Sequence, residues 1–399
     1  MLDNPNKIKI LLYGNIFRDE RSQILTKFLF DSKYHVSIVC PDFYVVEKNG
    51  KVTLVGKMFS LLYLIEFVVK AAFADIIYLP PMNNRFIKSA VWAAKLFQKK
   101  LIVEVYISLY DTLVRDRGSI KDGTRKAKSV KEKDILALTK SDYIIHTANH
   151  EIIYWEKFLD ISIERKKVFI APLCHASIPR QKNRQFRQDG ILKICWWGTF
   201  IPLHGLDNIL AAMQVLKQRG LSFTLNLFGV DNPFFSVYAE KIRESELERQ
   251  VFLRKDFGFG DGSLPQYLIE QCDLALGIFG NTDKAVNTIP NKLIEALAMG
   301  IPTLTMNSPA LKEFFQPEDL WTCDRSPLAI ANAIEAIASG EAYPVNWDRT
   351  RQNVLNTFSV ARYQDVVSKV LQKATAVKKL SDAQSEVFTI PQTVTEPKQ

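Results

Sequence analysis

The chain has 399 residues, of which 47% are hydrophobic and 24% charged, a balance typical of a soluble globular protein with room for two domains. Its five cysteines are scattered and show no C-x-x-C spacing, so the sequence favours a reducing compartment over a disulfide framework or a zinc site. The net charge of +9 arises in the first half of the chain and is densest over residues 115–133.

Short runs of β-branched and aromatic residues alternate with segments of helical length from the start of the chain. We expect strands at residues 8–13, 35–40, 76–79, 101–106, 143–146 and 168–171, with helices between them that include 21–30, 59–73 and 86–97. Such a βα repeat predicts a parallel sheet covered by helices on both faces.

The polar, basic stretch 179–190 interrupts this pattern and is predicted to be a linker. A second series follows, with strands at 192–197, 223–228, 251–253, 274–278 and 303–305 and helices at 206–219 and 328–338. The predicted architecture is therefore α/β, with two tandem Rossmann-like doubly wound domains at 1–185 and 186–345. Terminal helices at 346–375 and a disordered tail at 376–399 complete it. The cleft between the carboxyl ends of the two sheets is the expected site.

Two segments bear on membrane contact. The run 58–74 is the most apolar of the chain, but Glu66 and Lys70 interrupt it and it falls short of a span of about 20 residues. A buried or half-buried helix is favoured there over a membrane-surface element. The basic run 115–133 is either a solvated face or a patch for an anionic surface, meaning a phospholipid membrane or a phosphate-bearing acceptor. It lacks interleaved aromatic residues, so nucleic acid is not an expected partner.

The beginning of the chain bears on its location. Residues 1–7 are polar and the apolar run after them is short, which predicts no signal peptide. We therefore expect a cytoplasmic protein, with association at the inner face of the membrane as a further expectation.

The most informative segment is 273–302. It reads as a buried strand that ends in glycines at Gly280, a loop, and a short helix that begins after Pro290 and ends at Gly300. The amino end of such a helix offers free N–H groups and a positive dipole end to a phosphate. Lys292 and Glu295 share a face near this end, so one can hold a phosphate while the other accepts bonds from sugar hydroxyls.

A second turn of the same domain carries a related signal. The strand 192–197 is followed by Gly198, a loop to His204, and a helix from residue 206. A glycine at the end of a strand lets the backbone approach a diphosphate closely. Because both turns belong to one domain, we expect them to face the same cleft.

These elements resemble the retaining glycosyltransferases of the two-Rossmann-domain B fold, a superfamily that includes glycogen synthases and phosphatidylinositol mannosyltransferases. The resemblance covers about residues 7–371 and is specific only in the second domain. It implies transfer of a sugar from a nucleoside-diphosphate donor to a saccharide or lipid-linked acceptor, with retention at the anomeric carbon and without a metal or other cofactor. The chain agrees in having no D-x-D motif that would hold a divalent cation.

Carried over by position, Glu295 matches the second glutamate of the family's paired motif, which bonds the donor ribose, whereas the first falls at Asn287. Asn287 is kept as a catalytic candidate because an amide can still bond a hydroxyl. Relatives commonly have an arginine and a lysine where this chain has Thr199 and His204. We expect the missing positive charge to come from Lys292, with Lys284 and Arg254 as the other candidates. Asn291 and Gly229 are the remaining residues expected at the donor site.

In the first domain the best match to the histidine that faces the sugar in many relatives falls near Tyr106. Asp111 is a candidate to accept a bond from the acceptor hydroxyl, or else it caps a helix. Glu104 is a second candidate, although an exposed strand residue is the favoured interpretation. Gly14 and Asn15, at the end of the first strand, mark another loop of the cleft.

Two other functions stay open. Sugar-nucleotide epimerases share the architecture and act on the donor without an acceptor. A non-catalytic sugar-nucleotide-binding protein is favoured by the departures at Asn287, Thr199 and His204, since a fold does not guarantee activity.

Overall fold

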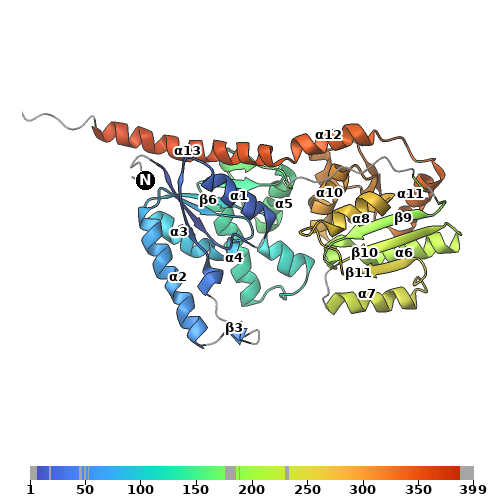
Figure 1. The fold of residues 1–399 in the computed structure, drawn as a ribbon. Helices are drawn as coiled ribbons and strands as arrows, with labels where there is room; N and C mark the ends of the chain where they lie inside the picture. The colour runs from blue at the N-terminus through green and yellow to red at the C-terminus, as the bar shows by residue number, and fades with distance from the viewer. Residues whose placement is uncertain are drawn as a thin grey trace, which may run out of the picture.

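The computed structural model describes residues 7–17, 19–44, 47–48, 51–52, 54–175, 186–187, 189–229 and 233–386. Within these ranges the chain forms two six-stranded parallel sheets, each covered by helices (Figure 1). A short antiparallel hairpin, β3 (Glu47–Lys48) with β4 (Lys51–Val52), stands apart from both sheets. Most of the predicted linker at 179–190 lies outside the described residues. The predicted α/β class with two doubly wound domains is confirmed.

The first sheet has the strand order β2-β1-β5-β6-β7-β8. Its strands are β1 (Lys9–Tyr13), β2 (His35–Val39), β5 (Ile76–Leu79), β6 (Lys100–Glu104), β7 (Tyr143–His146) and β8 (Val168–Ile170). Its main helices are α1 (Glu20–Phe30), α2 (Leu54–Phe73), α3 (Ile87–Leu96), α4 (Arg125–Thr139) and α5 (Asn149–Leu159). Helices α2 to α5 share one buried cluster with the sheet, whereas α1 belongs to a second cluster. The six strands expected in this half of the chain are present.

The second sheet has the order β11-β10-β9-β12-β13-β14. Its strands are β9 (Leu192–Trp197), β10 (Phe223–Phe228), β11 (Val251–Arg254), β12 (Leu274–Leu276), β13 (Thr303–Met306) and β14 (Trp321–Cys323). Its helices are α6 (Leu206–Gln218), α7 (Pro233–Glu244), α8 (Ser263–Gln271), α9 (Asp283–Asn287), α10 (Asn291–Met299) and α11 (Pro327–Ser339). Strand β14 at the sheet edge was not predicted.

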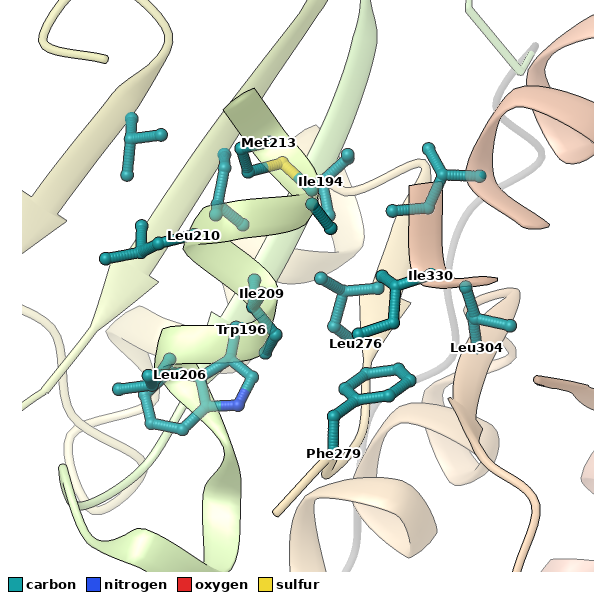
Figure 2. Close-up of a cluster of buried hydrophobic side chains, with 14 of the residues drawn as sticks. Ile194, Trp196, Leu206, Ile209, Leu210, Met213, Leu276, Phe279, Leu304 and Ile330 are labelled. Carbon is teal, nitrogen blue, oxygen red and sulfur yellow. The ribbon is translucent and has the colours of Figure 1, made fainter. Parts of the chain in front are cut away.

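The core of the second domain shows why these elements form. Leu206, Ile209, Leu210 and Met213 recur at helical spacing on α6 and pack onto side chains of the sheet such as Ile194 (Figure 2). Burying this stripe orients α6, and so fixes the loop that leads into it from the end of β9.

The last two helices connect the domains. Helix α12 (Trp347–Thr357) packs on α10, and α13 (Val360–Glu386) then runs back across the first domain (Figure 1). Tyr363, Val367 and Leu371 of α13 are buried in the cluster that also contains α1. The predicted terminal helices are present. The second of them is longer than expected, because residues 376–386 continue α13 where a disordered tail was predicted, and residues 387–399 lie outside the described residues.

Candidate active site

A cavity of about 420 Å³ lies between the two domains. Its walls come from the segments that follow the carboxyl ends of β6 and β7 in the first domain and of β9 and β12 in the second, where ligands of doubly wound sheets bind. Eight of the predicted site residues line it: Tyr106, Gly198, Thr199, His204, Lys284, Asn291, Lys292 and Glu295.

Gly198 allows two side chains to approach the backbone at the end of β9. Its φ of +137° is one that residues with a side chain rarely adopt. A Cβ atom at this position would lie 3.1 Å from Nζ of Lys292 and 3.3 Å from Cε1 of His204. The absence of a side chain thus leaves room for both groups beside the backbone.

Lys292 is the most unusual group of the cavity. It lies in the first turn of α10, its exposed fraction is 6%, and Nζ sits 3.6 Å from the ring centroid of Trp196. Nζ has no hydrogen-bond partner in the described part of the chain. Burial lowers the pKa of Lys292 well below its ordinary value, and the charge of Glu295 opposes this only in part. A buried amine without a partner is costly, so this position favours a bound anion.

Glu295 follows one turn later and also lines the cavity. Its carboxylate accepts a hydrogen bond of 2.5 Å from the indole Nε1 of Trp197 and lies 3.9 Å from Nδ1 of His175. Burial raises the pKa of Glu295, while the nearby His175 lowers it. The indole bond fixes the orientation of the carboxylate toward the cavity.

His204 does not supply positive charge here. Its Nδ1 donates to the carbonyl oxygen of Thr199, and its ring lies edge-on to Trp196 with centroids 5.3 Å apart. Burial lowers the pKa of His204 well below its usual value, and the positive charges of Lys292 and Arg117 lower it further. The imidazole is therefore neutral at neutral pH, and can serve a ligand only as a hydrogen-bonding group.

Polar contacts cross the cleft between α9 and the π-helical segment η3 (Asp111–Asp116). Nζ of Lys284 donates to Oγ1 of Thr112. The hydroxyl of Thr282 donates to Asp116 at 2.9 Å, and Arg115 pairs with Asp283 at 2.6 Å. The structure thus shows the two domains in direct polar contact at one end of the cavity.

A further contact across the cleft joins two predicted residues. The hydroxyl of Tyr106, after β6, donates to Oδ1 of Asn291 at 3.2 Å. Asp111 lies close by but does not line the cavity. It is fully buried and accepts a 2.8 Å bond from Tyr154, and burial raises its pKa to about 6. The predicted contact of Asp111 with an acceptor hydroxyl has no support from this position.

Glu104 has a different role from both predicted ones. It is fully buried, pairs with Arg21, and accepts bonds from Tyr78 at 3.2 Å and Tyr363 at 2.9 Å. The guanidinium of Arg21 also donates to the carbonyl oxygens of Ala171 and Pro172. Glu104 is therefore neither exposed nor a cavity residue, because it ties β6 to α1 and α13 inside the protein.

The remaining first-domain candidates lie outside the cavity wall. Gly14 has a φ of +139° and packs against Asn83, where a Cβ atom would overlap that side chain. The backbone N–H of Asn15 donates to Oδ1 of Asn83 at 2.7 Å, and its side chain bonds Asp42. Both residues shape the β1–α1 turn and do not line the cavity.

Three second-domain candidates are also displaced from the cavity. Oδ1 of Asn287 lies 2.8 Å from Nε2 of His150. Gly229 packs against Phe200. Arg254 is exposed and donates a hydrogen bond of 3.2 Å to Asn226. Arg254 lines a separate, shallower depression. The predicted donor-site roles of Gly229 and Arg254, and the catalytic role of Asn287, are not supported by these positions.

The structure adds cavity residues that the sequence did not single out. The polar ones from the first domain are Thr112, Asp116, Arg117, Thr147 and Glu151. Arg117 carries a charge and has no ion pair with any residue that the structure describes. Glu151 lies 3.3 Å from Nε2 of His146 and accepts a 3.4 Å bond from Thr288. Only the position of Arg117 in the basic run could have drawn attention to it from sequence.

Known proteins resemble this chain in one family model and in the overall fold. Residues 177–354 match the family model for glycosyl transferases group 1. Sucrose-phosphate synthase from Thermosynechococcus elongatus superposes with a TM-score of 0.65 at 14% identity, over 94% of this chain and 100% of that one. The structure of Anabaena HepE in complex with UDP and glucose superposes with a TM-score of 0.63 at 12% identity, over 92% of this chain and 100% of HepE. The lipopolysaccharide outer core galactosyltransferase WaaB superposes with a TM-score of 0.60 at 13% identity, over 92% of this chain and 99% of WaaB. The search of curated proteins found no match.

The family match covers the second domain and the structural matches cover nearly the whole chain. Together they support a glycosyltransferase of the B fold, and the resemblance noted in the sequence is confirmed at this level.

Proposed function

We propose that the protein transfers a sugar from a nucleoside-diphosphate donor, held in the cavity between the domains, to a hydroxyl of a saccharide or lipid-linked acceptor. The observation that carries this proposal is the buried Nζ of Lys292, which has no hydrogen-bond partner among the described residues and lines the same cavity as Glu295. The similar fold of HepE, which was solved with UDP and glucose, supports the same class of donor.

The donor is held by groups from both domains. The first turn of α10 presents free backbone N–H groups, and Lys292 adds a positive charge when a diphosphate raises its pKa. Arg117 faces the same cavity from the first domain and replaces the charge that relatives place at the positions of Thr199 and His204. Glu295, fixed by Trp197, accepts bonds from the ribose hydroxyls.

The reaction breaks the bond between the anomeric carbon and the diphosphate oxygen and forms one to the acceptor oxygen. Negative charge develops on the leaving diphosphate, and positioned cations stabilise it. Lys292 and Arg117 supply this charge, which supports a metal-independent reaction. Retention at the anomeric carbon is proposed from the family resemblance.

The acceptor lies on the first-domain side of the cavity. Two carboxylates of that domain line the wall, Asp116 and Glu151, and they take the place of Asp111 and Glu104 as groups that accept a bond from the acceptor hydroxyl. The net positive charge of this half of the chain supports an acceptor carried by an anionic membrane, at its cytoplasmic face. Such an acceptor places the enzyme in glycolipid or polysaccharide synthesis.

The test is a panel of nucleotide sugars, with release of nucleoside diphosphate followed in the presence of EDTA and a mixture of lipid-linked and saccharide acceptors. We expect one donor to be turned over, with the rate reduced at least tenfold in Lys292→Ala or Arg117→Ala. Matched controls are Lys312→Ala and Arg249→Ala, which remove exposed charges of the second domain that do not line the cavity.

The outcomes separate the functions. Epimerised sugar from donor alone would assign the epimerase activity, and donor binding without turnover over the whole acceptor panel would assign a binding protein. If no donor binds, or if the cavity variants behave like their controls, the proposed function is wrong.

A further inference from the structure

The outer face of helix α2 is apolar. Leu61, Ile65, Val69 and Phe73 recur at intervals of four and form one stripe along the helix. Their exposed fractions are 59%, 63%, 52% and 72%, whereas Phe67 on the opposite side is fully buried against the sheet. The helix expected to be buried or half-buried thus presents a second apolar face to solvent.

The apolar surface continues onto α3. Helices α2 and α3 contact each other and bury their inner sides in the same cluster, so their outer sides form one surface (Figure 1). On this side α3 exposes Trp92 and Leu96. Large apolar side chains gathered on two adjacent helices differ from the scattered exposed residues of an ordinary surface, and mark an interaction site.

Positive charge borders this apolar surface. Helix α4 contacts α3 and belongs to the same face of the sheet. Outside the core, the described side chains of the three helices include only two carboxylates, Glu66 and Glu132, and each is paired with a lysine. Among the side chains that the structure describes on these helices, the basic ones are Lys70, Lys88, Lys95, Arg125, Lys126, Lys128, Lys131 and Lys133.

We propose that the outer faces of α2 and α3, with the basic α4 beside them, dock the protein on a bilayer that contains anionic lipids. The apolar stripe enters the headgroup region while lysine and arginine side chains contact lipid phosphates. A second copy of the chain is a poorer partner for this face, because two surfaces with the same excess of positive charge repel each other.

The loop that leads into α3 connects this helix to the cavity. Met82, in the loop between β5 and α3, is 45% exposed and is also part of the cavity wall. A bilayer seated on α2 and α3 therefore brings a lipid-borne hydroxyl close to the first-domain side of the cavity. This inference rests on the proposed function for its purpose, but vesicle binding itself requires no donor.

The experiment is flotation of the full chain with vesicles of phosphatidylcholine alone or with added phosphatidylglycerol. We expect wild-type protein to float with the anionic vesicles only, and Ile65→Ser with Phe73→Ser to reduce the bound fraction by about tenfold or more. The matched control is Val237→Ser with Leu328→Ser, which removes two exposed apolar side chains of the second domain and should bind like wild type. Lys126→Glu with Lys128→Glu tests the charge without altering the apolar stripe.

Equal flotation of the apolar variant and its control would overturn the proposal, as would binding to neutral vesicles as strong as to anionic ones. If sedimentation analysis shows a dimer in wild-type protein and a monomer in the Ile65→Ser, Phe73→Ser variant, the face binds a second copy of the chain instead. Nucleoside-diphosphate binding is measured on the same samples without vesicles. If no nucleoside diphosphate binds, the proposed function is contradicted, but the conclusion from flotation is not affected. Thermal unfolding shows whether each variant is folded.

Discussion

Replacing Lys292 with methionine is expected to change stability and donor binding in opposite directions. Methionine is one heavy atom shorter than lysine but keeps an unbranched apolar side chain beside Trp196. It removes the buried amine, which lies over the Trp196 ring and has no hydrogen-bond partner among the described residues. Leaving such a group unsatisfied costs about 1–3 kcal/mol, so the free energy of unfolding of the ligand-free protein should rise by about this amount at pH 7.

The same substitution removes a charged hydrogen-bond donor from the proposed diphosphate site. A hydrogen bond to a charged group contributes about 1.5–3 kcal/mol, which predicts a Kd for the nucleoside diphosphate raised roughly 10- to 150-fold. Urea denaturation gives the stability, and calorimetric titration with a panel of nucleoside diphosphates gives the affinity. Lys312→Met, which alters an exposed lysine, is the control and should change neither.

The pH dependence of stability gives an independent check. Burial lowers the pKa of Lys292 in the folded protein below its unfolded value of about 10.4. Between the two pKa values the unfolded chain binds the proton and the folded protein does not, so this group makes the free energy of unfolding increase with pH. The stability advantage of Lys292→Met should therefore shrink as pH rises from about 7 to about 10. Loss of both stability and binding in the variant, or unchanged binding, would refute this role for Lys292.

Four other results are expected. Glu295→Gln should raise the KM for the donor by about tenfold with folding preserved, since a ribose contact weakens, and initial rates at varied donor would show it. Glu104→Ala should lower the free energy of unfolding by about 3–5 kcal/mol in urea, because Arg21 is left buried and unpaired; a loss below about 1 kcal/mol would contradict the structural role. Gly198→Ala should weaken diphosphate binding, because its φ of +137° disfavours a side chain and the added methyl group would crowd Nζ of Lys292. Unchanged affinity in a calorimetric titration would show that this backbone is not close to the ligand. Diphosphate binding should take up more protons in wild-type protein than in Lys292→Met at pH values between the lowered pKa of Lys292 and its ordinary value, as calorimetry in buffers of different ionisation enthalpy measures.

The local patterns of the sequence were sufficient for most of the fold. Runs such as residues 192–197 and 223–228 are apolar and bounded by turn residues, and they form β9 and β10. Strand β14 escaped prediction because it has only three residues, Trp321 to Cys323, and lies at the edge of its sheet. Hydropathy identified helix α2 but could not show that Ile65 and Phe73 face solvent, because the hydropathy of a residue does not depend on whether the fold buries or exposes it.

The site was predictable where one short segment supplies it. Lys292 and Glu295 lie in the first turns of α10, and their spacing alone places them together. Glu104 was misjudged because its partners Arg21 and Tyr363 are 83 and 259 residues away in sequence. Arg117 could not be identified because only the packing of one domain against the other brings it to the same cavity as Lys292.

A structure with a nucleoside diphosphate bound would test the central claim most directly. The account predicts the phosphates at the amino end of α10, with a phosphate oxygen within about 3 Å of Nζ of Lys292 and the ribose on the carboxylate of Glu295. A diphosphate bound elsewhere, with Nζ of Lys292 still buried and without a ligand contact, would contradict it.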